Sequence, residues 1–288
     1  MTYFEAAILG LIQGIFMFVP VSSTAHLVLA QHFMIGRGSE MPPPESASMI
    51  LFDLVVHIGT LVSIAIVFRR SLSGLLRATW SETRAVLHRE GEPARLGPFS
   101  KLMLMGVITV GVTGVLGLLL KRSFEAVFGS PQILMVTLSV TALLLFMTDR
   151  LGRRPLGVKD IGPCMAVIIG IAQALALIPG ISRSGITIIA GLFSGLKRRW
   201  AAEYSFLVAI PTILAAGLLQ AIEVIGTDST EAVGTGPMIV GFTVAAISGT
   251  FALRLVLVLL YRAQLKFFSV YLLCLVALIG FGVLDGLL

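Results

Sequence analysis

Long apolar runs fill most of this 288-residue chain and leave few folds open to it. The runs cover residues 4–35, 50–68, 102–120, 132–148, 162–195, 204–225, 237–260 and 267–287. A membrane-spanning helix needs about 20 apolar residues. Hydrophobic residues make up 57% of the chain and charged residues 12%, against the ~25% charged residues usual in soluble domains. The sequence therefore predicts an all-α polytopic membrane protein.

Two of these runs, 4–35 and 162–195, are interrupted by a proline that hydroxyl-bearing residues follow. The first break reads Pro20-Val-Ser-Ser-Thr-Ala-His26, and the second reads Pro179-Gly-Ile-Ser-Arg-Ser-Gly-Ile-Thr187. Proline removes a helical hydrogen bond, and broken backbone is tolerated at membrane depth only inside protein or beside a water-filled cavity. Each run is therefore predicted to be a re-entrant helical hairpin. Two unrelated proline kinks in a helical bundle are the alternative.

Basic residues mark one face of the predicted membrane protein. Most of the 21 lie in the loop 69–101 and in the segments 149–160, 197–199 and 262–266, and loops rich in Lys and Arg stay in the cytoplasm. Because these residues lie in loops between apolar runs and form no soluble basic face, a nucleic-acid partner is not expected. A chain path that keeps these segments on the cytoplasmic side needs two re-entrant hairpins and six transmembrane helices, and it places both termini outside.

The predicted elements divide into two repeats of inverted topology. Residues 1–149 would hold hairpin 4–35 and spans 50–68, 102–120 and 132–148, and residues 150–288 would hold hairpin 162–195 and spans 204–225, 237–260 and 267–287. Three spans per half is an odd number, so the second half crosses the membrane in the opposite sense. Gly10 and Gln13 precede the first break as Gly170 and Gln173 precede the second. Inverted repeats commonly place a polar site where the breaks meet.

Arg183 lies in the second break, deep inside an apolar run. A buried guanidinium is costly unless it is paired or hydrated, so an arginine within the membrane is a candidate functional residue. Its planar fork matches phosphate oxygens, and the hydroxyls and free N–H groups at a helix start also bind anions. The two breaks together predict a cradle for phosphate. The alternative is an ion pair between Arg183 and a carboxylate such as Asp53 or Glu203.

The two broken segments resemble the paired signatures of the bacterial undecaprenyl-diphosphate phosphatases, also called bacitracin-resistance proteins. Residues 20–26 and 179–187 carry the resemblance, and residues 52–60, 170–178 and 202–211 support it. The resemblance implies a multi-pass protein of the bacterial inner membrane that removes the terminal phosphate from undecaprenyl diphosphate, a polyprenyl diphosphate lipid, at the outer face. It also implies recycling of the cell-wall lipid carrier, bacitracin resistance and a Mg²⁺ or Ca²⁺ cofactor.

The resemblance also implies roles for individual side chains. Arg183, His26 and Ser23 would be catalytic, with His26 as nucleophile or as base for a water or for Ser23, and the sequence leaves these three roles open. A lone histidine in an apolar run is otherwise a hydrogen-bonded core residue. The residues that would bind substrate are Gln13, Ser22, Thr24, Ser182, Ser184 and Thr187. The 30 glycines would permit close helix contacts, including those of a homodimer.

One position departs from the family pattern. The first signature begins with Glu or Gln and has Glu four residues later, whereas this chain has Gln13 and Met17. A thioether cannot replace a carboxylate as ligand to a hard cation, so the predicted metal ligands are Gln13 and, as a substitute, Asp53. Met17 otherwise fits a core residue of a catalytically impaired paralogue that binds or translocates undecaprenyl phosphate. His26 and the intact second signature favour the enzyme.

Overall fold

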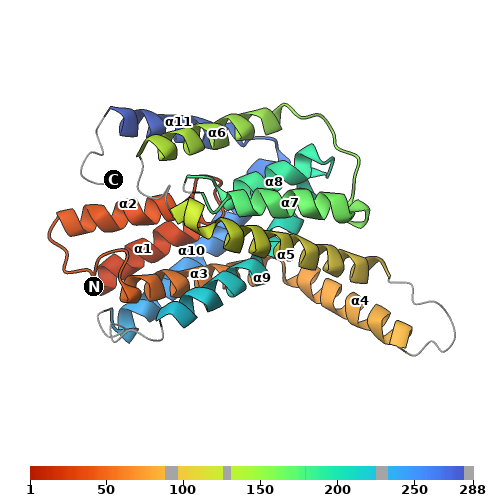
Figure 1. The fold of residues 1–288 in the computed structure, drawn as a ribbon, viewed down its shortest axis with the longest axis horizontal. Coiled ribbons are helices and arrows are strands. Elements are labelled where there is room, and N and C mark those ends of the chain that lie inside the picture. The colour runs from red at the N-terminus through yellow and green to blue at the C-terminus, as the bar shows by residue number, and fades with distance from the viewer. Residues whose placement is uncertain (88–96, 126–130, 179, 225–232, 282–288) are drawn as a thin grey trace.

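The computed structural model describes residues 1–87, 97–125, 131–178, 180–224 and 233–281, and within them the chain forms helices joined by turns and loops (Figure 1). The elements in chain order are α1 (Tyr3–Phe16), α2 (Ser23–Gly36), α3 (Ala47–Val67), α4 (Arg69–Leu87), α5 (Pro98–Glu125), α6 (Pro131–Asp149), the 3₁₀ helix η1 (Val158–Asp160), α7 (Pro163–Leu175), α8 (Arg183–Phe193), α9 (Arg198–Val224), α10 (Thr235–Tyr261) and α11 (Lys266–Gly280).

Five of the described helices, α3, α5, α6, α9 and α10, are long and apolar enough to cross a membrane. The sixth predicted span, 267–287, corresponds to α11, whose described part is 15 residues long; residues 282–288 lie outside the described part of the chain. The prediction of an all-α polytopic membrane protein is confirmed.

Both interrupted runs form pairs of helices joined by a short irregular segment. Helices α1 and α2 flank residues 17–22, and α7 and α8 flank residues 176–182, of which Pro179 lies outside the described residues. Figure 1 shows that the first pair enters from the end of the molecule that holds the start of α1 and the end of α11, and that the second pair enters from the opposite end. The division into repeats at residue 149 stays a prediction.

The basic loop 69–101 was the least accurate part of the sequence-based description, because its first 19 residues form helix α4. Leu72, Leu75 and Leu76 recur at helical spacing and line an apolar groove with residues of α5 and α9. Arginines occupy other positions of the same helix, so α4 is amphipathic rather than apolar. The helical pattern of this segment was not recognised in the sequence, because the segment carries too many charged residues to be a membrane span.

Each hairpin packs against a span from the other half of the chain. Helix α1 lies along α10, and α7 lies along α5. A Cβ atom on Gly10 would stand 2.4 Å from the carbonyl oxygen of Gly241, and a Cβ on Gly170 would stand 2.8 Å from that of Thr109. Small residues at these crossings let the backbones approach closely, as is usual between helices in membranes.

Replacing Gly10 by Ala is expected to destabilise the protein by about 1–3 kcal/mol, because the added methyl group meets backbone that cannot move aside. The measurement is the midpoint temperature of thermal unfolding in detergent. Gly114→Ala is the matched control, since Gly114 lies within α5 and a Cβ there meets nothing within 4 Å. An equal or higher midpoint for Gly10→Ala would contradict the close approach of α1 and α10.

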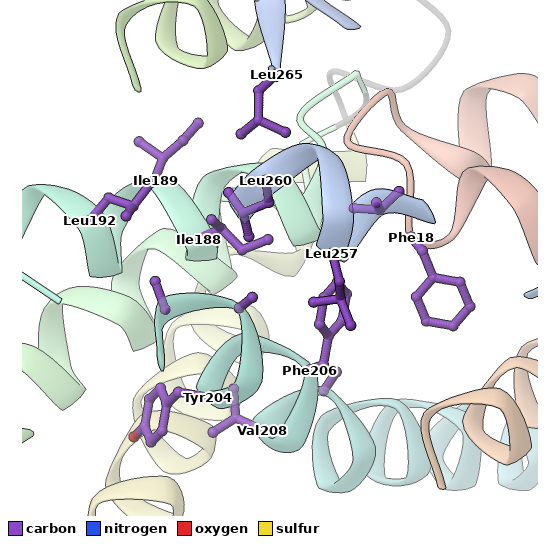
Figure 2. Packing of buried hydrophobic residues seen from close by; sticks show 14 of the residues in the cluster. Phe18, Ile188, Ile189, Leu192, Tyr204, Phe206, Val208, Leu257, Leu260 and Leu265 are labelled. Carbon is purple, nitrogen blue, oxygen red and sulfur yellow. The ribbon is translucent and has the colours of Figure 1, made fainter. Parts of the chain in front are cut away.

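The segment after α1 is held by a hydrophobic cluster from the second half of the chain. Phe18 is fully buried and meets Phe206 of α9 edge to face, with ring centroids 5.7 Å apart. Ile188 of α8 and Leu257 of α10 belong to the same cluster (Figure 2). The first break is therefore fixed in place by packing against residues far away in the sequence.

Candidate functional site

The two broken segments touch each other near the middle of the molecule (Figure 1). The hydroxyl of Ser184 donates to the carbonyl oxygen of Phe18 at 3.4 Å. A Cβ atom on Gly185 would lie 3.2 Å from Cβ of Pro20. The guanidinium of Arg183 lies 3.8 Å from the sulfur of Met17. We call this contact region, residues 17–23 together with 182–187, the junction.

Two helices begin at the junction and turn the positive ends of their dipoles toward it. Helix α8 is capped in the ordinary way, because the hydroxyl of Ser182 accepts from the N–H of Gly185 at 3.3 Å. Helix α2 is not: Ser22 has φ 69° and makes no side-chain capping bond. A non-glycine residue in the left-handed region is strained, and such strain is concentrated at functional sites. The start of α2 therefore presents backbone N–H groups without a side-chain cap.

Arg183 has no carboxylate partner among the described residues. Its one hydrogen bond is the weak contact with Met17, and its Nη1 is buried without a partner. The alternative of an ion pair with Asp53 or Glu203 is not what the structure shows. Asp53 accepts from Gln31 at 3.1 Å, and Glu203 pairs with Arg199 at 2.8 Å.

Gln13 adds a second unsatisfied polar group beside Met17. Its amide nitrogen donates to the Met17 sulfur at 3.6 Å, and its Oε1 is buried without a partner. Buried polar atoms are nearly always hydrogen-bonded, so an exception needs an explanation. Here α1 contributes an unpaired acceptor, Gln13 Oε1, and α8 contributes an unpaired donor, Arg183 Nη1, which belongs to a positively charged guanidinium. This combination fits a site that receives a polar, anionic ligand.

His26 lies one turn into α2 and is held in one orientation. Its Nδ1 is 2.7 Å from the carbonyl oxygen of Ser22, so Nδ1 carries the proton and donates. Nε2 is then the basic nitrogen, and it accepts from the hydroxyl of Tyr271 at 2.6 Å. The ring of Phe16 stacks on the imidazole with centroids 4.2 Å apart. The arrangement leaves Nε2 as the atom that can take a proton or attack a substrate.

The remaining predicted residues divide by exposure. Ser182, Ser184 and Thr187 are buried, and the Thr187 hydroxyl bonds to that of Ser205 at 2.5 Å and so faces the protein interior. Ser23 is half-buried at the first position of α2, whereas Thr24 is exposed. Ser22 is buried as well, so Ser22, Ser182 and Ser184 lie inside the junction, while Ser23, Arg183 and His26 are half-buried.

Asp53 belongs to a neighbouring polar group on α3 rather than to the side chains around Gln13. It accepts from Gln31, and its carbonyl oxygen lies 2.7 Å from Nδ1 of His57. The structure therefore gives no contact between Asp53 and Gln13, the two predicted metal ligands, and the described residues contain no group of three His, Cys, Asp or Glu side chains that could hold a metal.

Sequence reasoning missed three residues around His26 and Asp53, namely Tyr271, Phe16 and Gln31. Tyr271 is 245 residues from His26 in the chain, and no local pattern marks it. Phe16 and Gln31 occupy ordinary positions of apolar helices. Only the pairing of His26 with an aromatic partner could have been sought, and the sequence offers many candidates.

Comparison with known proteins identifies the family of this chain. The family model of the bacitracin resistance protein BacA matches residues 6–278. Proteins named undecaprenyl-diphosphatase are similar over nearly the full length: one from Halorhodospira halophila is 53% identical over 99% of both chains, and one from Alkalilimnicola ehrlichii is 53% identical over 99% of this chain and 98% of that one. A third, from Carboxydothermus hydrogenoformans, is 35% identical over 94% of both. This chain belongs to the bacitracin resistance protein BacA family.

Proposed function

We propose that this protein hydrolyses undecaprenyl diphosphate to undecaprenyl phosphate and inorganic phosphate. The family supports the proposal, as do the relatives that carry the name of this activity. The observation that carries it is an arginine with a buried, unpaired Nη1 and no carboxylate partner among the described residues, placed at the junction where α2 and α8 begin. His26, whose Nε2 is the basic nitrogen, lies one turn into α2. A diphosphate is the kind of ligand that these groups complement.

Binding would place the terminal phosphate between the start of α2 and Arg183. The guanidinium donates in a planar fork to phosphate oxygens, and the uncapped N–H groups after Ser22 donate to the remaining ones. Phosphoryl transfer depends mainly on positioning and on neutralising the charge that develops in the transition state. Because Arg183 lies in a protected site and its charge is permanent, this interaction strengthens as charge moves onto the phosphate oxygens.

His26 would act as the general base for water. Its Nε2 accepts a proton from the attacking water, the water oxygen forms a bond to the terminal phosphorus, and the bond from that phosphorus to the bridging oxygen breaks. Undecaprenyl phosphate leaves with the bridging oxygen. Tyr271 donates its hydroxyl to Nε2, and Phe16 stacks on the ring, so both residues fix the direction in which Nε2 points. The Tyr271 hydroxyl must turn away before the attacking water can donate to the same lone pair.

The side chains at the junction do not make a Mg²⁺ or Ca²⁺ site on their own. These ions take roughly six to eight oxygen ligands, carboxylates above all. The junction has the amide oxygen of Gln13 and serine hydroxyls, a thioether at Met17, and the positive charge of Arg183. We propose that a divalent cation reaches this site only as a complex with the diphosphate, which supplies the missing negative charge and oxygen ligands.

Met17→Glu is expected to create a metal ligand beside Gln13 and to raise the affinity of the substrate-free protein for Ca²⁺ about tenfold or more. Equilibrium binding of radioactive Ca²⁺ to purified protein measures this affinity directly, and the Mg²⁺ concentration for half-maximal phosphate release should fall in parallel. Met17→Gln is the control, because it adds an amide oxygen without a charge. Tight Ca²⁺ binding by the unsubstituted protein without substrate would contradict the proposal.

The setting of this activity is proposed to be the bacterial inner membrane, with both termini on the periplasmic side. The start of α1 and the end of α11 lie at one end of the molecule (Figure 1), and most of the basic segments fall at the other end. The first hairpin would then open toward the periplasm, where Ser22, Ser23 and His26 meet substrate.

Phosphate release from undecaprenyl diphosphate by the purified protein in detergent tests the proposed function. We expect release in the presence of Mg²⁺ or Ca²⁺. No release from the unsubstituted protein, together with release from Met17→Glu, would overturn the proposal in favour of an impaired paralogue. Binding and transfer of undecaprenyl phosphate between vesicle leaflets would then be the activity to measure.

A further inference from the structure

A pocket lined in part by basic side chains lies at the far end of α8 from the junction. It has a volume of about 420 Å³ and lies between the loop after α6, the turn that joins α8 to α9, and the end of α10. Helix α8 has 11 residues, so with a rise of ~1.5 Å per residue the pocket stands about 16 Å from Arg183. It is separate from the junction and belongs to the face predicted to be cytoplasmic.

Four cationic side chains line this pocket, and its lining contains no acidic residue. They are Arg153, Arg154, Lys197 and Arg198. Arg154 Nε is buried without a hydrogen-bond partner, and so is Arg198 Nη1, which lies 4.0 Å from the carboxylate of Asp149. Leaving a buried charged donor unpaired costs free energy. Within the described chain, Arg153, Arg154 and Lys197 form no ion pair, so most of the positive charge in the pocket is not neutralised by protein.

The backbone around the pocket is held rigidly. The N–H of Leu156 donates to Gly195 at 3.1 Å, and the N–H of Lys197 donates to Leu156 at 3.0 Å, which ties the arginine loop to the turn after α8. Arg198 Nη2 donates to the carbonyl oxygen of Thr148 at 2.7 Å, which fixes the end of α6. Helix α9 begins at Arg198, and its positive dipole end adds to the cationic charge. Such a preformed cluster of donors is suited to an anion with several oxygens.

We propose that this pocket binds the phosphate group of an anionic lipid. The chemistry is that of a phosphate oxyanion, and the position favours a lipid as its source. The pocket lies at the ends of membrane-spanning helices, and basic pockets between such helices on the cytoplasmic side recognise lipid head groups. Apolar side chains, Leu151 and Leu192, form part of its wall, and Tyr261, a further lining residue, is 44% exposed, so an acyl chain can leave the pocket along an apolar surface.

Native mass spectrometry of the full chain in an uncharged detergent tests the proposal. The probes are dioleoyl phosphatidylglycerol and, with the same chains and no net charge, dioleoyl phosphatidylcholine. We expect one phosphatidylglycerol to be retained per chain in preference to phosphatidylcholine. The pair of substitutions Arg154→Gln and Lys197→Gln should weaken this retention about thirtyfold, because two cations close to the head group are lost.

The matched control removes the same number of charges elsewhere on the same predicted face. Arg77 and Arg84 of α4 lie outside the pocket, and Arg77→Gln with Arg84→Gln should leave retention unchanged. Equal weakening by both pairs would overturn the proposal, because diffuse surface charge would then explain the binding. Equal retention of the two lipids would overturn it as well.

Two further measurements keep the result unambiguous. Arg153→Gln with Lys197→Gln changes two exposed side chains only and should repeat the loss if the first pair lowers the unfolding temperature. Inorganic phosphate is titrated against bound phosphatidylglycerol. If low millimolar phosphate displaces the lipid, the ligand of the pocket is free phosphate and the lipid proposal is overturned. Phosphate release at the junction should be unaffected by either pocket pair, so failure of this proposal and failure of the phosphatase proposal are distinguishable.

Discussion

Arg183→Ala is expected to lower kcat/KM for phosphate release from undecaprenyl diphosphate by about 10³-fold. The substitution removes the permanent charge at the junction, where no other cation among the described residues is in hydrogen-bond contact with Met17 or Gln13. Arg183→Lys keeps the charge and loses the planar fork, so we expect an intermediate loss of about tenfold to a hundredfold. Initial rates over a range of substrate concentrations, measured in detergent, separate kcat from KM.

Arg254→Ala is the matched control for this loss. Arg254 is also an arginine within an apolar helix, α10, but it is exposed and lies outside the junction. Its replacement should leave the rate within about twofold, since surface substitutions away from a site have small effects. A loss of similar size in both variants, or full activity in Arg183→Ala, would contradict the assignment of Arg183 as the residue that stabilises the transition state.

His26→Ala is expected to lower kcat by about 10²–10⁴-fold and to change KM little, as befits the loss of a general base. The prediction rests on the orientation of the ring, in which Nδ1 donates to the Ser22 carbonyl and Nε2 is the basic nitrogen, which accepts from the Tyr271 hydroxyl. His32→Ala is the control: it is on the same helix and its Nδ1 contacts the carbonyl of Val28 at 3.0 Å. His26→Ala with full activity would remove the imidazole from the mechanism.

Tyr271→Phe separates orientation of the imidazole from its chemistry. The tyrosine hydroxyl bonds to Nε2 at 2.6 Å, so its loss should lower kcat about tenfold, less than loss of the ring itself, as for other residues that orient a reactive group. Rapid quenching with substrate labelled in the terminal phosphate tests the base role. If the unsubstituted protein becomes labelled and His26→Ala does not, the histidine attacks phosphorus directly.

The broken hairpins could be predicted because a physical constraint acts locally. Proline removes a backbone hydrogen bond of a helix, and membrane lipid cannot satisfy the groups that it frees. Because α9 continues through Pro211, the hydroxyl-bearing residues that follow proline in the two interrupted runs are part of the signal. The segments 17–22 and 176–182 therefore had to lie inside protein, and the structure has irregular backbone at both places. Helix α4 was missed for the opposite reason: its arginines mark it as polar, and only the fold, in which Leu72 and Leu76 line an apolar groove with residues of α5 and α9, shows which side is apolar.

Asp53 shows what residue identity alone leaves open. The sequence marks it as a carboxylate in an apolar run that could substitute for the missing glutamate, and it says nothing about the neighbours of Asp53. In the fold it bonds to Gln31, two turns along α2 from the junction. Carboxylates in apolar helices find local donors because an unpaired charge there is costly. A polar residue in a span is thus a sign of some partner, and the sequence does not say which one.

The sequence by itself determined that the chain is a helical membrane protein with two broken hairpins, since hydropathy and proline act within a single segment. It also marked Arg183 and His26, because polar groups in apolar runs are rare and costly. Only the tertiary structure decided that Arg183 contacts Met17 rather than a carboxylate, and that Tyr271 orients His26. Those contacts join residues more than 150 positions apart, and they depend on how glycine-lined helices from the two halves cross, which no local pattern encodes.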